Sequence, residues 1–180
     1  MRAYLAVPLL ALGLAACGSD AEEPVPSISQ DRIAEEVGEL PVPVAGLYRR
    51  TTEILEFDVP GASDEDLEKM QQEARVENEI EERCLTEEDA AKGYKDLVQD
   101  LSQTQDGLSC NFTRFNADGS QLDAKLACDA ALGASANIAI AGTMEPEATD
   151  MIMDMSIGLG FVGEMKMKIA MKSERIGPCP

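Results

Sequence analysis

The feature that most restricts the fold of this chain is a run near its C-terminus in which apolar and cationic side chains alternate. The apolar positions are Met165, Met167, Ile169 and Met171, and the residues between them are Lys166, Lys168, Ala170 and Lys172. Successive side chains of a β-strand point to opposite faces, so this spacing predicts a strand with one apolar and one solvated face. Such a strand needs neighbouring strands that share its apolar face.

Five further segments have the composition or alternation of strands: residues 47–59, 109–115, 120–128, 138–144 and 151–157. Residues 116–119 (NADG) predict a hairpin turn. Ser63 and Thr86 each precede an acid three residues on, which predicts two helices, ending near Ala74 and near Leu101. We therefore expect an α+β, mainly β fold: a six-stranded antiparallel meander sheet, curved or barrel-like, with two short helices inserted after the first strand.

The N-terminus indicates export. One basic residue, Arg2, precedes an apolar run over residues 3–16, which is shorter than the about 20 residues that span a bilayer. We interpret residues 1–16 as a lipoprotein signal peptide and Cys17, at the end of a lipobox (LAAC), as the acylated residue. Glycine rather than aspartate follows Cys17, which favours an anchor in the outer membrane facing the periplasm. Acyl chains such as palmitate would hold the chain there.

The mature chain divides into two parts on composition. Residues 17–43 are rich in acidic residues and proline, which predicts a tether that buries no core. Residues 44–180 have a length that suits a single disulfide-bonded, β-rich domain.

Charge and the lack of histidine exclude several function classes. Removal of residues 1–16 takes away one of the 15 basic side chains and none of the 34 acids, so the mature chain carries a net charge of −20. This charge argues against a nucleic-acid partner. The chain has no histidine, which removes the usual general base and the commonest ligand for zinc or copper(II). We assign no catalytic, cofactor-binding or metal-binding residue.

Four cysteines remain besides Cys17, and an even number in an oxidising compartment predicts two disulfides. They are Cys84, Cys110, Cys128 and Cys179. Three connectivities are possible. We prefer 84–110 with 128–179, because Cys110 and Cys128 flank one hairpin and would lie diagonally across it.

The stretch GLGFVGEMKMKIAM, residues 158–171, has the glycine spacing of a dinucleotide site and several methionines. A dinucleotide site needs a helix after the glycines, whereas a period-two strand follows here, so Gly158, Gly160 and Gly163 are interpreted as a connection between strands. Thioethers bind copper(I), and the methionines at 151, 153, 155, 165 and 167 share strand faces. A methionine-filled core would require the same spacing.

Several segments together resemble the bacterial envelope family catalogued as domain of unknown function 3617. The resemblance covers roughly residues 43–179, and Tyr48 stands where tryptophan is expected. It implies a secreted or lipidated, disulfide-bonded domain and adds no catalytic residue. The segments are Gly46-Leu47-Tyr48, Cys84-Leu85-Thr86, Cys110 with Phe112, Cys128, the methionine-rich region, and Arg175-Ile176-Gly177-Pro178-Cys179.

We therefore expect a non-catalytic, lipid-anchored envelope protein that binds a partner protein or an apolar ligand. One alternative is a copper(I)- or silver(I)-binding, methionine-rich envelope protein. A second alternative is a carboxylate-dependent hydrolase of cell wall or glycan, although no pair of acids is singled out by its spacing.

Overall fold

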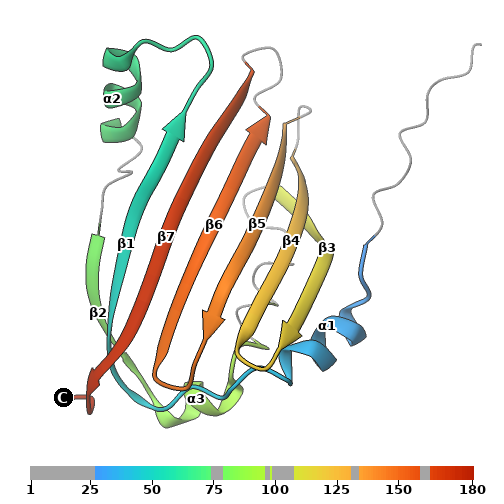
Figure 1. Cartoon of the computed structure of the whole chain (residues 1–180), viewed down its shortest axis with the longest axis vertical. Coiled ribbons are helices and arrows are strands. Elements are labelled where there is room, and N and C mark those ends of the chain that lie inside the picture. Colours follow the sequence, from blue (N-terminus) through green and yellow to red (C-terminus); the bar gives the residue numbers. More distant parts are fainter. Residues whose placement is uncertain (1–26, 74–78, 96–97, 99–107, 131–133, 159–162) are drawn as a thin grey trace, which may run out of the picture.

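The computed structural model of the chain describes residues 27–73, 79–95, 98, 108–130, 134–158 and 163–180. Its described part is one seven-stranded sheet with three helices (Figure 1). The strands are β1 (Gly46–Asp58), β2 (Glu79–Leu85), β3 (Leu108–Asp118), β4 (Gln121–Ala130), β5 (Ser135–Met144), β6 (Ala148–Gly158) and β7 (Glu164–Gly177). The helices are α1 (Gln30–Val37), α2 (Asp64–Glu73) and α3 (Glu87–Lys92).

The strands lie in the order β2-β1-β7-β6-β5-β4-β3, and every neighbouring pair is antiparallel. Strands β3 to β7 follow one another as a meander, and β1 pairs with β7 at the end of that series. The mainly β, antiparallel fold is therefore confirmed, including all six expected strands. The sheet is open, with β2 and β3 at its two edges, rather than closed into a barrel.

The seventh strand, β2, was not expected from the sequence. Its residues EIEERCL carry charges on both faces, so they show no apolar alternation. It is an edge strand, and the side chain of Ile80 is 70% exposed. Charged side chains are common on edge strands, because they discourage pairing with other chains.

The two expected helices begin where the caps predict. The Asp66 amide donates to Ser63 Oγ over 3.2 Å, and the Asp89 amide donates to Thr86 Oγ1 over 3.1 Å. Helix α2 ends near the predicted Ala74. Helix α3 ends at Lys92 before Gly93, whose φ of 62° interrupts the helical backbone. Helical conformation resumes beyond this break at Lys95 and Val98, and the Val98 amide donates to the Tyr94 carbonyl over 3.1 Å. Most of the remainder of that predicted helix lies outside the described residues.

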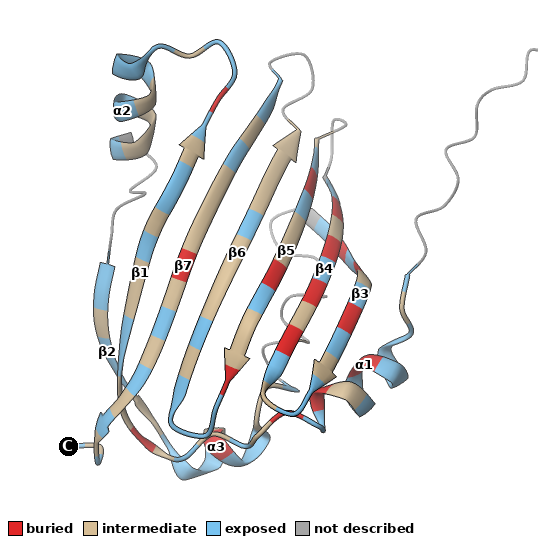
Figure 2. Cartoon of the chain, viewed as in Figure 1, coloured by how far each residue is buried: buried red, intermediate tan, exposed pale blue. Residues whose placement is uncertain are grey.

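The sheet has one apolar and one polar face, and its core lies on part of the apolar face. Buried residues gather on β3, β4 and β5, whereas β6 has none and the one on β7, Ala170, lies on the polar face (Figure 2). The core cluster joins these three strands to α1 and the residues that follow it. Ile33, Val37 and Leu40 are its members from that N-terminal segment.

This packing corrects the predicted tether. Residues 17–43 were expected to bury no core, yet Ile33 is 1% exposed, and the Ile28 amide donates to the Phe112 carbonyl of β3 over 2.8 Å. The packed domain therefore extends N-terminally to about residue 28. A short helix with two buried apolar residues gives a weak sequence signal, since most helical stability comes from tertiary packing.

The predicted disulfide pairing is also wrong. The structure joins Cys84 to Cys179, and Cys110 to Cys128. The hairpin turn lies at Gly119 and Ser120 instead of residues 116–119.

A β-bulge explains the pairing within the hairpin. The ladder that places Arg114 opposite Lys125 would put Cys110 opposite Asp129 if it continued without interruption. Thr113 is left out of the pairing, which shifts the register by one residue and brings Cys110 directly opposite Cys128.

Candidate functional site

Three rows of side chains on the apolar face cross six strands, because directly opposed residues of antiparallel strands share a face. From β3 to β1, the first row is Phe112, Leu126, Ile138, Met155, Met167 and Phe57. The second row is Phe115, Ala124, Ile140, Met153, Ile169 and Ile54. The third row is Ala117, Leu122, Gly142, Met151, Met171 and Thr52. A fourth row crosses five strands, from β3 to β7, and consists of Cys110, Cys128, Ala136, Ile157 and Met165.

Burial along these rows is uneven. In the first row Phe112 and Leu126 on β3 and β4 are each 2% exposed, whereas Met155 and Met167 on β6 and β7 are half-buried. We call the half-buried apolar positions of these two strands the methionine-rich half-face. It comprises Met151, Met153, Met155, Ile157, Met165, Met167, Ile169 and Met171. The predicted alternation is confirmed, but these methionines are less buried than a closed core requires.

In the described part of the chain, the cover of the apolar face comes from one side. Helix α1 packs on the edge strand β3, and Tyr94 and Val98, which follow α3, pack against the core cluster. Burial raises the pKa of the Tyr94 hydroxyl. Met151 and Met153 on β6 also contact that cluster. Among the described residues the cover is therefore thickest over β3 to β5.

We divide the six methionines into two groups of three, the upper and lower corners. Met153 lies two residues from both Met151 and Met155, and we count it in the lower corner because it packs against the core cluster, as Met151 does. In the upper corner Met155 lies opposite Met167, and Met165 is two residues from Met167 on the same face. In the lower corner Met151 lies opposite Met171, with Met153 two residues from Met151. Opposed Cβ atoms in antiparallel strands are about 4.5–5.5 Å apart. Each corner thus holds three long, flexible thioether side chains within reach of one another.

The polar face of the sheet holds a hollow of about 470 Å³ over β5. One row of its lining runs through Lys125, Ala139, Asp154, Lys168 and Glu56. The charges in it alternate, and Lys168 pairs with Asp154 over 3.4 Å. Small side chains of β5 create the hollow, and the surrounding charges fit a solvated face.

A second group of polar residues gathers where β1 begins and β7 ends. The Tyr48 hydroxyl lies 2.7 Å from the Val44 carbonyl and 3.1 Å from the Pro146 carbonyl, so its single hydrogen is shared between two acceptors. Burial raises the Tyr48 pKa, which the nearby Arg175 guanidinium partly offsets.

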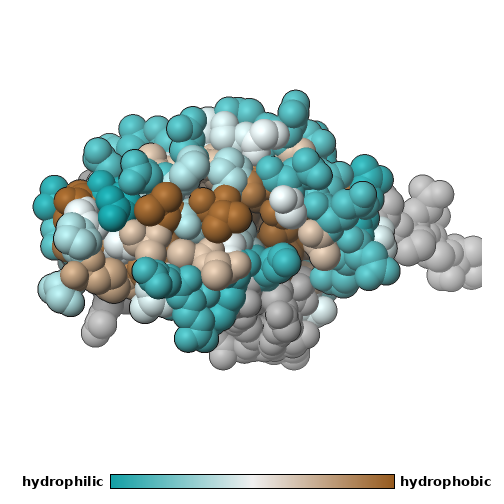
Figure 3. Space-filling model, turned by 90° about the horizontal axis from the view of Figure 1, so that it is seen from below, coloured by the Kyte–Doolittle hydropathy of each residue, from teal (hydrophilic) through white to brown (hydrophobic). Residues whose placement is uncertain are grey.

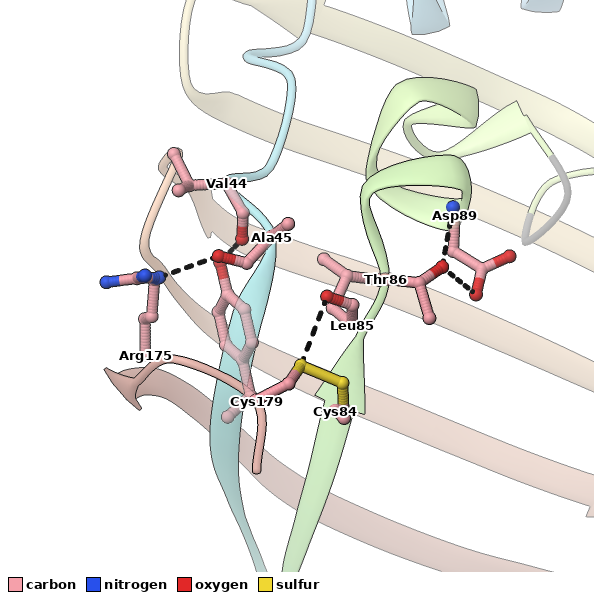
Figure 4. The surroundings of a disulfide bond; sticks show 9 residues. Val44, Ala45, Cys84, Leu85, Thr86, Asp89, Arg175 and Cys179 are labelled. Atoms are coloured by element: carbon pink, nitrogen blue, oxygen red, sulfur yellow. Dashed lines mark hydrogen bonds between the residues drawn. A yellow bond between two sulfur atoms is a disulfide. The ribbon is translucent and has the colours of Figure 1, made fainter.

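Arg175 completes this group. Its Nε donates to the Ala45 carbonyl over 2.9 Å, and Nη1 lies 3.4 Å from Glu147 Oε1. A Cβ on Gly46 would collide with the Arg175 side chain, so this position needs glycine. The Cys84–Cys179 disulfide closes the same region by joining the C-terminus to β2 (Figure 4). The contacts tie four chain segments together, which indicates a structural role.

The end of the sheet below this group is partly apolar. Seen from that end, hydrophobic side chains form a band with hydrophilic ones around it (Figure 3). Val42, Val44 and Ile176 are exposed large hydrophobic residues beside β1 and β7. They are separate from the methionine-rich half-face, which lies on the broad side of the sheet.

The positions predicted from the sequence have different outcomes. Cys17, Gly160 and residues 1–16 lie outside the described residues, and no helix within the described part is long and apolar enough to cross a bilayer. Within that part no group of three or more acids and cysteines could hold a metal ion. The group around Tyr48 was missed as a unit, although Gly46, Tyr48, Cys84, Arg175 and Cys179 were all noted singly.

Comparison with known proteins identifies the family. The family described as "Protein of unknown function (DUF3617)" has a model that matches residues 43–179. The chain belongs to this family. No curated protein and no solved structure matches it.

The DUF3617 match agrees with the residues that carried the resemblance in the sequence. Gly46, Tyr48, Cys84, Arg175 and Cys179 come from three distant stretches of the chain and meet at one end of the sheet. The match extends over all seven strands, while α1 lies N-terminal to it. Membership of DUF3617 supplies a family without an assigned activity.

Proposed function

We propose that this DUF3617 chain is a non-catalytic lipoprotein of the bacterial envelope that binds an apolar ligand on its methionine-rich half-face. The observation that carries the proposal is the uneven burial of the apolar rows. Leu126 of β4 is 2% exposed, while Met155 and Met167 of the same row are half-buried. Apolar surface left near solvent is typical of a ligand or partner site.

The chemistry of the half-face supports an adaptable binding surface. Methionine is unbranched and has three rotatable bonds, so its side chain can adjust to ligands of different shape. The face is continuous, because Phe57 and Ile54 of β1 extend its rows beyond β7. An amphiphile could lay its apolar part on these strands while its polar part stays in solvent.

The sequence supports the envelope location. Residues 1–17 have the charged, apolar and small-residue regions of a lipoprotein signal peptide. The chain enters the packed domain at Ile28, which is bonded to β3, whereas the half-face lies on β6 and β7. An anchor at Cys17 would thus attach the domain by the sheet edge away from the proposed binding strands.

The test measures binding of a fluorescent apolar probe, N-phenyl-1-naphthylamine, to the mature lipidated chain in detergent, with palmitate as competitor. We expect wild-type protein to bind the probe and Met155→Lys/Met167→Lys to lose that binding, because two charges are placed on the apolar rows. Ala141→Lys is the matched control, since it adds a lysine on the polar face at an exposed position. Equal binding by all three proteins would contradict the proposal.

A further inference from the structure

Six of the nine methionines of the chain lie on the apolar side of two adjacent strands, β6 and β7. A core can be filled by leucine and isoleucine, as Ile157 and Ile169 do on the same strands, so a hydrophobic requirement does not explain this choice of side chain. What methionine adds to apolar area is a polarizable sulfur atom. A group of thioethers on one surface is a donor set suited to a soft metal ion.

The upper corner places three methionine residues side by side on one face of the sheet. Met155 and Met167 are directly opposed, and Met165 lies two residues along β7, about 6.6–6.8 Å away on the same face. Each sulfur lies two bonds beyond its Cβ atom on a flexible side chain, so the three thioethers can converge above the sheet. All three are half-buried, which keeps them within reach of an ion from solvent.

The lower corner differs in its surroundings. Met151 and Met153 pack against the core cluster, so their side chains already have apolar partners. The two corners have the same number of thioethers and the same strand geometry. They therefore provide a matched pair within one protein.

The remaining soft or nitrogen donors of the domain do not compete with the thioethers. The chain has no histidine, and Cys84, Cys110, Cys128 and Cys179 are all joined in disulfides. Thioethers favour copper(I), whereas carboxylates suit harder ions such as magnesium and calcium. The strongly acidic composition also attracts cations to the surface.

We propose that Met155, Met165 and Met167 form a binding site for one soft monovalent metal ion, copper(I) or silver(I). The ion is held by three thioether sulfurs above β6 and β7. This site goes beyond the proposed apolar-ligand function, because it depends on sulfur and not on apolar area.

The experiment titrates the mature lipidated chain, in detergent and with its disulfides intact, with silver nitrate in chloride-free buffer. Calorimetry gives the stoichiometry, and 13C spectra of methyl-labelled methionine show which side chains respond. Copper(I), kept reduced with ascorbate, is then measured by competition with the chromophoric ligand bicinchoninate.

We expect one ion to bind and the methyl signals of the three upper-corner methionines to shift together. Met155→Leu/Met167→Leu should lose the ion, whereas Met151→Leu/Met171→Leu, which removes the same number of thioethers from the lower corner, should keep it. Uptake that survives in Met155→Leu/Met167→Leu, uptake lost equally from both variants, or no uptake by wild type would each overturn the proposal.

The same variants separate this proposal from the apolar-ligand function. Leucine replaces methionine at similar volume and keeps the surface apolar, so Met155→Leu/Met167→Leu should still bind N-phenyl-1-naphthylamine. Loss of silver binding with probe binding retained supports a sulfur site. If the wild-type protein does not bind the probe, the apolar-ligand function is refuted. The silver titration still tests the metal site independently. Circular dichroism of each variant verifies that the sheet is intact.

Discussion

Cys110 lies directly opposite Cys128 across β3 and β4, with Cα atoms 4.0 Å apart, because Thr113 is left out of the strand pairing. The Cys84–Cys179 disulfide joins residues that are 95 positions apart in the sequence, whereas Cys110 and Cys128 are 18 positions apart. In the chain-entropy description, a cross-link stabilises by restricting the unfolded chain, and a longer loop gives a larger effect. The two disulfides are therefore expected to differ in their contribution to stability.

We predict that Cys84→Ala/Cys179→Ala lowers the free energy of unfolding by about 4.7 kcal/mol, and Cys110→Ala/Cys128→Ala by about 3 kcal/mol through loop entropy alone. Urea denaturation of both variants beside wild type provides the comparison. The hairpin pair is also buried in the core, so its loss carries an added packing term. Peptide mapping without reduction should first recover Cys84 with Cys179, and Cys110 with Cys128. Any other pairing would remove the basis of the comparison.

The Tyr48 hydroxyl group is expected to stabilise the region where β1 begins and β7 ends. Tyr48→Phe keeps the ring and removes the contacts to the Val44 and Pro146 carbonyls, so we expect a loss of about 0.5–1.5 kcal/mol in the free energy of unfolding. Tyr94→Phe is the control, because no hydrogen bond of its hydroxyl occurs among the described residues. Thermal unfolding of the two variants should show a lower melting temperature for Tyr48→Phe. Equal melting temperatures would mean that the shared hydrogen contributes nothing.

Stability should fall at high pH through the same residues. Burial raises the folded-state pKa of both Tyr48 and Tyr94 above the value of 10.0 that applies to an exposed tyrosine. Above pH 10 the unfolded chain therefore loses these protons before the folded chain does, which makes unfolding more favourable as pH rises.

Both groups are the only tyrosines expected in the mature chain, since the third of the chain's three, Tyr4, lies in the signal peptide. Spectrophotometric titration of the folded protein should place all tyrosinate absorbance above pH 10, and titration in guanidinium should return it to about pH 10. A folded-state transition at the unfolded position would contradict the shift.

The strands were predictable wherever one face is apolar and the other solvated. The alternation of lysine with apolar residues predicted β7, where Lys166 and Lys168 separate Met165, Met167 and Ile169. The same kind of alternation predicted β6, and its methionines lie on the same face of the sheet. The sequence of β2 lacks this alternation of apolar and polar residues. An edge strand can carry charged side chains on both faces, so it does not need an apolar face.

Other features depend on distant packing or on one irregular residue. The alternation does not indicate how far a row is covered. The difference in burial between Leu126 and Met155 therefore became visible only with the tertiary positions of elements such as α1 and Tyr94. The correct disulfide pairing required the bulge at Thr113, and an unbulged ladder gives the wrong partner. The group around Tyr48 and Arg175 required the strand order, which brings β7 beside β1.

The anchor is the prediction with the largest consequence for the proposed function. In a Gram-negative host supplied with radiolabelled palmitate, we expect the wild-type chain to incorporate label and to separate with outer-membrane fractions, because Cys17 would carry acyl chains that each contribute about 0.8 kcal/mol per buried CH2. Cys17→Ser should carry no label and leave the membrane. Cys84→Ala/Cys179→Ala is the control for cysteine loss in general, and it should still be labelled. Label retained by Cys17→Ser, or wild-type protein that fractionates without membrane, would refute the lipoprotein assignment.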